Sequence, residues 1–379
     1  MDFNLTTEEQ LIQKVAKEYS ETVIAPLAEQ IHATNDVPEE VFQGMRELGF
    51  FGINAPEEFG GGGGNYLSFL LAIYELSKSS AGVGMIMSVN NFCHCLIAAL
   101  GDDEQKATYL PKIIAGEEIA SFAFTEASTG SDPKQLTCLA TLDGDDYVLN
   151  GSKRFITNAS FPGPMILVAK EESTGRATAF IIDKFAEGYS LSEPWEKIGV
   201  HGGPLYDVYF KDFRVPAKNI MGGLGGGMLI LKAAMVYAKV GVCGISLGVA
   251  TAAYEEALAF AKDKTHRGEP IVKKFEHIRF TLIEMEMKLL AAKWAVYHYA
   301  WSLDNNSDLF QLAKEAAMAK AAVTEAGVDI VNQAMSIIGS YGVVTDYKIS
   351  RLWGDIIIGP QVEGSASTLK AMAASILLM

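Results

Sequence analysis

The chain has few cysteines and far fewer cationic than anionic side chains, and each shortage excludes a class of protein. Four cysteines in 379 residues, at irregular spacing, are too few for a disulfide framework. With 31 Lys and Arg against 46 Asp and Glu, the formal charge of −15 repels phosphate backbones. We therefore expect no nucleic acid as a partner, and buried, reduced thiols at Cys93, Cys95, Cys138 and Cys243.

Targeting and membrane signals are also lacking. The first ten residues, MDFNLTTEEQ, are acidic and contain neither the apolar stretch of a signal peptide nor the arginines of a transit peptide. We expect no apolar run of the length that a membrane span needs, which predicts no membrane partner and a cytoplasmic location. The run Cys93-His94-Cys95 offers metal-ligand chemistry, but successive helical positions point about 100° apart, so we expect no metal site.

The residues that are present divide the chain into three parts. The length exceeds one simple core, and 49% hydrophobic with 20% charged residues is the composition of a soluble globular protein. Residues 1–117 show helical periodicity, and residues 118–225 show short alternating runs separated by turn residues. Residues 226–379 are alanine-rich, poor in proline and helical, which predicts an antiparallel bundle. The fold class is therefore α+β, and mostly α.

Two further patterns have ordinary explanations. The glycine run 222–227 looks like a dinucleotide fingerprint, but it lacks the βαβ context, so we interpret it as the hinge between the second and third parts. Aromatic residues recur at helical spacing near residue 300, which favours core or a subunit interface over a cofactor site. They are Trp294, Tyr297, His298 and Trp301.

The segment Ser121–Asn158 has the most informative pattern. Its loop from Thr125 to Asp132 is rich in hydroxyls and small residues, which leaves backbone N–H groups accessible to a ligand. In the following hairpin, Phe155 and Thr157 share one strand face, so an apolar wall lies beside a hydrogen-bonding group. That arrangement suits a planar heteroaromatic cofactor, although periodicity alone favours an ordinary hairpin with a polar loop.

The motifs themselves resemble those of a known family. SFAFTEASTGSD (121–132) followed by NGSKRFITN (150–158) closely resembles the flavin-binding signature of the acyl-CoA dehydrogenase family, T-E-P-x-A-G-S-D and then N-G-x-K-x-W-I-T-N. DIIIGPQVEGS (355–365) resembles the family segment that carries a catalytic glutamate. The resemblance covers essentially the whole chain. It implies an N-terminal helical domain (1–117), a middle β-barrel-like domain (118–225), a C-terminal four-helix bundle (226–379) and a homotetramer.

The resemblance also implies a reaction, the α,β-dehydrogenation of an acyl-CoA thioester or the reduction of an enoyl-CoA in reverse. A carboxylate takes the α-proton while a hydride passes between the β-carbon and N5 of FAD, and electrons are exchanged with an electron-transferring flavoprotein. Glu363 matches the base, and its apolar neighbours should raise its pKa towards neutrality. An isolated Glu-Gly pair would ordinarily be a surface turn.

By the same comparison, the cofactor-binding positions fall into two groups. The first would lie at the flavin, with Gly130 and Ser131 near the phosphates or the CoA, and comprises Phe122, Phe124, Thr125, Gly130, Ser131, Phe155, Ile156, Thr157 and Ser365. The second matches positions that hold the ADP half of FAD, and comprises Lys264, Glu276, Ser336, Gly339 and Ser340. Several of these depart from the family pattern: Lys264 stands for an arginine, and Glu276 and Ser336 stand for glutamines. Lysine keeps the charge but loses the bidentate fork.

Two alternative functions and two inferences about the substrate follow from the sequence. An acyl-CoA oxidase would pass electrons to oxygen, and a non-catalytic flavin- or CoA-binding subunit is suggested by the departures, although the retained Glu363 speaks against it. Val362 stands where straight-chain members commonly have tyrosine, which predicts a wider cleft for branched, cyclic or aryl acyl groups, unless a neighbouring side chain refills it. Gly84 stands where the glutaryl branch has an arginine, which disfavours glutarate-type substrates.

Overall fold

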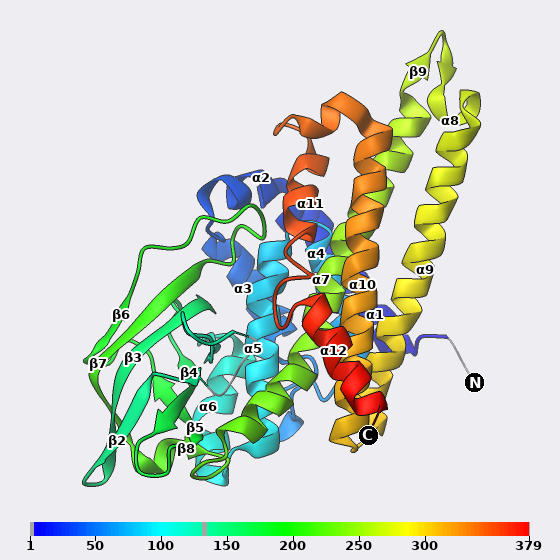
Figure 1. Ribbon diagram of the computed structural model, residues 1–379. Helices are drawn as coiled ribbons and strands as arrows, with labels where there is room; N and C mark the ends of the chain where they lie inside the picture. Colours follow the sequence, from blue (N-terminus) through cyan, green and yellow to red (C-terminus); the bar gives the residue numbers. More distant parts are fainter. Residues whose placement is uncertain (1–3, 131–134, 379) are drawn as a thin grey trace.

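The computed structural model describes residues 4–130 and 135–378. A layer of short helices and a twisted sheet lie on one side of a bundle of long helices (Figure 1). The expected fold class, mostly α with a β domain in the middle of the chain, is confirmed.

The N-terminal part is helical because its helix starts are well capped. Thr6 begins the first helix with a capping box, in which its side chain accepts from the Glu9 amide and Glu9 accepts from the Thr6 amide. Asp102 and Gln105 do the same for the last helix of this part. The helices are α1 (Thr7–Tyr19), α2 (Ala25–Thr34), α3 (Glu39–Glu47), α4 (Tyr66–Ser77), α5 (Ala81–Leu100) and α6 (Asp103–Ala115).

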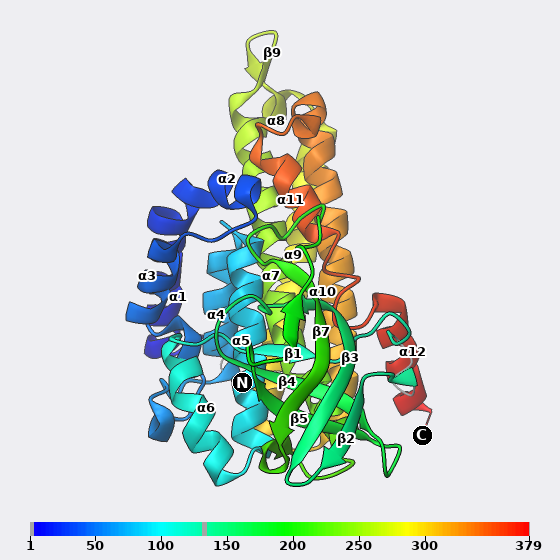
Figure 2. The ribbon, with the colours of Figure 1, turned by 90° about the vertical axis from the view of Figure 1, so that its left-hand side faces the viewer.

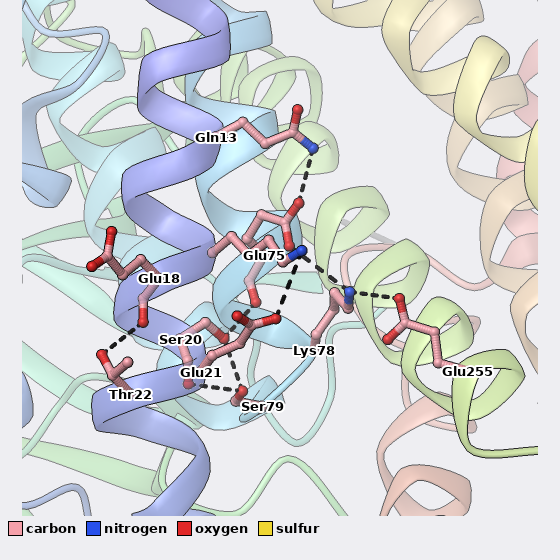
Figure 3. Close-up of polar contacts among 10 residues, drawn as sticks. Gln13, Glu18, Ser20, Glu21, Thr22, Glu75, Lys78, Ser79 and Glu255 are labelled. Carbon is pink, nitrogen blue, oxygen red and sulfur yellow. Dashed lines mark hydrogen bonds and ion pairs between the residues drawn. The ribbon is translucent and has the colours of Figure 1, made fainter. Parts of the chain in front are cut away.

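Polar contacts tie α1 and α4 to the first long helix of the bundle (Figure 3). Gln13 donates to the buried Glu75 carboxylate at 2.8 Å, and Lys78 donates to Glu255 of α7 (Gly227–Asp263) at 2.7 Å. Burial raises the pKa of Glu75, while the amide of Gln13 and the charge of Lys78 oppose that rise. Buried polar groups with partners of this kind fix the register of the helices.

The middle domain is one mixed sheet in the order β6-β7-β3-β2-β4-β5-β8, with β1 paired to β4. The β1–β4 and β2–β4 pairs are parallel and the other pairs are antiparallel. Gly144 turns the predicted hairpin with φ 66°. The strands are β1 (Ser121–Ala123), β2 (Leu139–Asp143), β3 (Asp146–Thr157), β4 (Pro164–Glu171), β5 (Ala177–Asp183), β6 (Tyr189–Leu191), β7 (Leu205–Pro216) and β8 (Ile220–Met221).

The C-terminal part packs three long helices, α7, α9 (Glu276–Asn305) and α10 (Leu309–Ile338), with the shorter α11 (Lys348–Ile356) and α12 (Ala366–Leu377). A two-stranded hairpin, β9 (Thr265–His266) and β10 (Glu269–Pro270), and α8 (Ile271–Lys274) join α7 to α9. Figures 1 and 2 both show this hairpin at the end of the bundle farthest from the sheet.

Two helices correct the expectation that no apolar run reaches membrane-spanning length. Ala81–Leu100 and Gly227–Asp263 are both long and apolar enough by length and composition. Their most apolar windows are 83% and 67% buried inside the protein, because α7 packs against α4, α5 and α10 in the centre of the molecule. Apolarity on every side is the expected pattern for a core helix of this kind.

The four cysteines are buried and free, as the sequence predicts. Within residues 4–130 and 135–378, His, Cys, Asp and Glu form no cluster of three that could hold a metal ion. His94 lies inside α5, where burial lowers its pKa to about 3 and its Nε2 contacts Asn91 at 3.1 Å.

Candidate active site

The loop that follows β1 is held open by one buried carboxylate. Glu126 accepts from the Thr137 amide and hydroxyl, each at 2.6 Å, from the Cys138 amide at 3.1 Å and from the Lys153 ammonium at 2.7 Å. Burial alone would raise the pKa of Glu126, but the Lys153 charge and these donors lower it overall. Both side chains of the pair are buried, and Lys153 also donates to the Phe124 carbonyl at 3.1 Å. The side chains predicted to face a ligand take no part in these hydrogen bonds, and Phe124 contributes only its backbone carbonyl.

An exposed aromatic wall lies on β3, next to that loop. The pairing of β3 with β7 shifts between Lys153 and Ile156, so β3 carries an irregularity there. Within it, Phe155 adopts φ 60°, uncommon for a bulky residue, and its side chain is 51% exposed. Trp195 packs beside it, with ring centroids 5.5 Å apart.

Two charged residues fix this wall from behind. Asp207 accepts from Arg154 Nε and Nη2 at 3.1 Å and from Trp195 Nε1 at 3.0 Å. The Arg154 guanidinium lies 5.8 Å from the Phe155 ring centroid and 5.5 Å from that of Trp195, within cation–π range. The sequence analysis did not identify Trp195, which is distant in the chain from the flavin-like motif.

The structure distributes the other predicted flavin positions unevenly. Phe124 is buried at the start of the loop, and Phe122 and Thr157 are partly exposed. The Ile156 side chain is buried in the sheet core, so only its backbone can face a ligand. Gly130 is exposed, and no atom lies within 4 Å of where a Cβ would stand. Ser131 lies outside the described residues.

Glu363 lies in the turn between α11 and α12. The turn places it in the left-handed region at φ 52°, followed by Gly364 at φ 91° and by Ser365, which caps α12. Its Oε2 atom is buried and has no hydrogen-bond partner. Burial raises the pKa of Glu363 to about 7, and the charges of Lys239 and Lys320 oppose a larger rise. A buried carboxyl without a partner, titrating near neutrality, is suited to accept or donate a proton.

Two buried lysines accompany Glu363, and the sequence analysis did not identify either. Lys239 of α7 and Lys320 of α10 are both fully buried. Lys320 Nζ donates to the Gly364 carbonyl at 2.8 Å, and Lys239 Nζ donates to the Met235 carbonyl of its own helix at 2.7 Å. Each lysine is flanked by buried apolar residues, Lys239 by Ala238 and Val240 and Lys320 by Ala319 and Ala321. A lysine within such an apolar run was the signal available in the sequence.

A narrow apolar pocket opens beside Val362. Met85 of α5, Val242, Ile245 and Val249 of α7, and Ile358 line it with Val362, and Ser246 and Asp355 add polar atoms. The space left by a valine in place of a tyrosine at position 362 is therefore bordered by other large apolar side chains. Gly84 packs so closely on Ser77, with 2.2 Å between its would-be Cβ and the hydroxyl, that no side chain fits there.

Gly354 lies near this pocket, and close packing explains why it has no side chain. A Cβ on Gly354 would lie 2.1 Å from the Ile198 carbonyl, because the 198–200 loop packs directly on α11. Asp355 accepts from the Val200 amide at 2.5 Å. Burial raises the pKa of Asp355 to about 6, and the charges of Arg351 and Lys197 oppose this. The two cations that act on Asp355 are thus Arg351, one turn earlier in α11, and Lys197, which precedes the 198–200 loop.

The positions predicted to hold the ADP half of FAD lie elsewhere. Lys264 ends α7 and donates to the Tyr341 hydroxyl at 3.1 Å, while Glu276 begins α9 at the same end of the bundle. Ser336 and Ser340 are exposed, and Gly339 ends α10 with φ 69°. These predicted ADP-half positions lie at the end of the bundle farthest from the sheet (Figure 1). Within one chain they are therefore separated from Phe155, which lies on β3 of that sheet.

The site residues fit a flavin on the evidence of the chain itself. An exposed aromatic wall, an open glycine at position 130 and backbone groups of the Glu126 loop offer the apolar face and the space that a planar cofactor needs. Phe155, Trp195 and Thr157 would hold the ring, and Gly130 would admit the phosphates. FAD, when bound, supplies a hydride acceptor or donor.

Comparisons with known proteins identify the family of the chain. The acyl-CoA dehydrogenase N-terminal, middle and C-terminal domains match residues 6–117, 121–213 and 225–378. The chain is 36% identical over 377 residues to a 3-(aryl)acrylate reductase of Clostridium sporogenes, covering 98% of this chain and 99% of that protein. It is 31% identical to the caffeyl-CoA reductase-Etf complex subunit CarC of Acetobacterium woodii, covering 98% of each chain.

Solved structures give the same assignment. Butyryl-CoA dehydrogenase from Megasphaera elsdenii superposes with a TM-score of 0.96 at 31% identity, over the full length of both chains. A chain from work on the electron transferring flavoprotein of Acidaminococcus fermentans superposes with a TM-score of 0.96 at 32% identity, also over the full length of both. The family of these proteins is FAD-dependent. The chain belongs to the acyl-CoA dehydrogenase family.

Proposed function

We propose that the protein is an FAD-dependent enzyme that interconverts an acyl-CoA and its α,β-unsaturated enoyl-CoA, with Glu363 as the acid–base group. The observation that carries the proposal is the Glu363 carboxyl, whose buried Oε2 atom has no hydrogen-bond partner, at the position that matches the family's base. A structural carboxylate would be satisfied by neighbouring donors, as Glu126 is.

The residues of the chain have separable tasks in this reaction. Deprotonated Glu363 takes the α-proton in dehydrogenation, and protonated Glu363 returns it in reduction. A pKa of about 7 makes both forms available at neutral pH. The apolar pocket excludes water from the acyl group, which strengthens the electrostatic interactions there.

We propose an enoyl-CoA with a planar or bulky acyl group as the substrate. Three relatives support the reductive direction, because their names are 3-(aryl)acrylate reductase, acryloyl-CoA reductase (NADH) and caffeyl-CoA reductase-Etf complex subunit CarC. Val362 borders the pocket and is smaller than the tyrosine common in straight-chain members of the family. Val362→Tyr is expected to lower kcat/KM for cinnamoyl-CoA more than for crotonyl-CoA. An equal change for both would remove Val362 from the specificity argument.

We propose an electron-transferring flavoprotein as the redox partner. Support comes from the Acetobacterium woodii relative, a reductase–Etf complex subunit, and from the Acidaminococcus fermentans structure. The oxidase alternative has a structural relative, a prolyl acyl carrier protein oxidase that is 27% identical with a TM-score of 0.93. Peroxide formed at the rate of acyl-CoA consumption, with no partner protein present, would favour the oxidase.

We propose a homotetramer. Apolar side chains form a stripe along the exposed side of α9, and their spacing alternates between three and four residues before a final step of seven. They are Phe280, Ile283, Met287, Leu290, Trp294 and Trp301. A second copy of the chain would cover this stripe and could supply the ADP-half residues in trans. Met287→Glu is expected to halve or quarter the mass measured by light scattering.

One experiment tests the enzyme proposal directly. The purified protein should be yellow, and anaerobic addition of 3-phenylpropionyl-CoA or butyryl-CoA should bleach the flavin absorbance. Cinnamoyl-CoA should reoxidise the dithionite-reduced protein. A protein that stays colourless after addition of FAD would contradict the proposal.

A further inference from the structure

The turn that carries Glu363 is fastened by a buried cation. Lys320 projects from the middle of α10, is fully buried, and donates from Nζ to the Gly364 carbonyl at 2.8 Å. That carbonyl belongs to the residue after the base, in a turn where both Glu363 and Gly364 have positive φ. A hydrogen bond at this point fixes the peptide that sets the direction of the Glu363 side chain.

A second buried cation lies on the neighbouring helix. Lys239 of α7 is fully buried, and its Nζ is held by the Met235 carbonyl at 2.7 Å and lies 3.6 Å from the Met235 sulfur. In the part of the chain that the structure describes, neither Lys239 nor Lys320 forms an ion pair within 4 Å. Of the charged groups around each lysine, Glu363 stabilises the ammonium form most.

Holding the Glu363 turn in place does not by itself require two buried cations. A neutral donor would hold the Gly364 carbonyl equally well, and a buried ammonium is costly unless a negative charge compensates it. Glu363 supplies that charge when it is ionised. The two ammonium groups therefore favour the form of Glu363 that can accept a proton.

We propose that Lys320 and Lys239 are positioning residues for Glu363: Lys320 orients the base through the Gly364 carbonyl, and both lysines electrostatically favour the carboxylate. The inference rests on the proposed function, because it concerns the protonation state that the reaction uses. The other titratable groups around Glu363 are Cys243 of α7 and Tyr299 of α9, and Glu325 acts on Lys320 from within α10. Burial raises the pKa of Cys243 to about 12, and that of Tyr299 well above its usual value, so both stay neutral.

The proposal predicts opposite effects in the two directions of the reaction. Removing a positive charge raises the pKa of Glu363. Dehydrogenation needs the carboxylate, so its rate is lost at acidic pH, and that loss should begin at a higher pH. Reduction needs the carboxylic acid, so its rate is lost at alkaline pH, and activity there should persist to a higher pH.

The test compares pH profiles of kcat/KM from pH 5.5 to 10. The variants are Lys320→Met, Lys239→Met and Lys320→Arg. Dehydrogenation is measured with 3-phenylpropionyl-CoA and a one-electron acceptor dye, and reduction is measured with cinnamoyl-CoA and the dithionite-reduced enzyme. Butyryl-CoA and crotonyl-CoA replace these two substrates if the wild-type protein uses them better. Lys232→Met, an exposed lysine of α7, is the matched control. A shift of about one pH unit in either Met variant would lower dehydrogenation about tenfold on the acidic side of the profile. At pH 9.5 the kcat/KM of the same variant for dehydrogenation should lie within about threefold of the wild-type value. Lys320→Arg keeps the charge and should leave the apparent pKa unchanged.

The outcomes separate this proposal from the one it rests on. A wild-type protein that turns over neither pair of substrates overturns the proposed function. A wild-type protein with a clear pH profile, and Met variants that lose activity equally at every pH in both directions, overturns the positioning role alone. If Lys320→Met does not fold, Lys239→Met decides the electrostatic part, and a shifted profile in Lys320→Arg counts against the charge as the cause.

Discussion

Glu126 in the β domain and Glu363 in the bundle both have buried lysines nearby, yet their hydrogen bonding and the directions of their pKa shifts are opposite. Glu126 accepts from four donors, one of them the Lys153 ammonium at 2.7 Å. Glu363 has a buried oxygen with no partner, and its nearby ammonium groups bond backbone carbonyls instead. The pKa of Glu126 is lowered and that of Glu363 is raised to about 7.

The two sites contrast a carboxylate whose oxygens have hydrogen-bond donors with one that has a buried oxygen without a donor. Burial disfavours ionisation in both, so the direction of each pKa shift depends on how many donors reach the oxygens. A satisfied carboxylate stabilises the fold, whereas an unsatisfied one keeps a free lone pair for a substrate proton at a cost in stability. Substitutions at the two positions should therefore affect different properties.

The largest effect is expected for Glu363→Gln. The amide cannot accept the α-proton, so turnover should fall by about 10²–10⁴-fold while the fold and the flavin spectrum persist. Stopped-flow bleaching of the flavin by an acyl-CoA measures this step. Near-normal bleaching in the variant would place the base at another residue.

Glu126→Gln should act on stability instead. The change leaves the Lys153 ammonium buried without a counter-charge, which typically costs about 3–5 kcal/mol. Chemical denaturation followed by circular dichroism measures the loss, and Glu126→Gln combined with Lys153→Met should recover part of it. Glu104→Gln is the matched control, because the exposed Lys218–Glu104 pair has a similar distance, 2.6 Å, and should contribute almost nothing.

The pH dependence of stability should have opposite signs at the two sites. The raised pKa of Glu363 means that its ionisation destabilises the folded state as pH rises from the unfolded value, about 4.3, towards 7. Glu363→Gln should therefore be more stable than wild type at pH 8 by about 1–3 kcal/mol, with the difference vanishing near pH 4.5. The pKa of Glu126 is lowered in the folded state, so its ionised form stabilises the fold at pH values above the pKa of the unfolded chain. That stabilisation is lost as the pH falls through the folded-state pKa. A Glu363→Gln variant no more stable than wild type at pH 8 would show that the Glu363 charge compensates the buried Lys239 and Lys320 by as much as its own burial costs.

The smallest effect concerns the surroundings of the two carboxylates. Cys138, whose amide donates to Glu126, and Cys243, near Glu363, are both buried thiols with raised pKa values. Cys243→Ser should shift the activity profile by less than about half a pH unit, because a neutral group replaces a neutral group. A larger shift, measured as in the lysine variants, would show that the thiol ionises.

Local signals in the sequence were enough for the family and the fold class, and they predicted Glu363 as the base. Capping residues such as Thr6 and Asp102 start helices, the Gly144 turn makes a hairpin, and the motifs at 121–132, 150–158 and 355–365 are contiguous. The tertiary structure decided the rest. Lys239 and Lys320 lie 124 and 43 residues before Glu363, and Trp195 lies 40 residues beyond Phe155. No periodicity links residues so far apart, and only the packing of α7 against α10, and of the 195–200 loop beside the sheet, brings their charges and rings together.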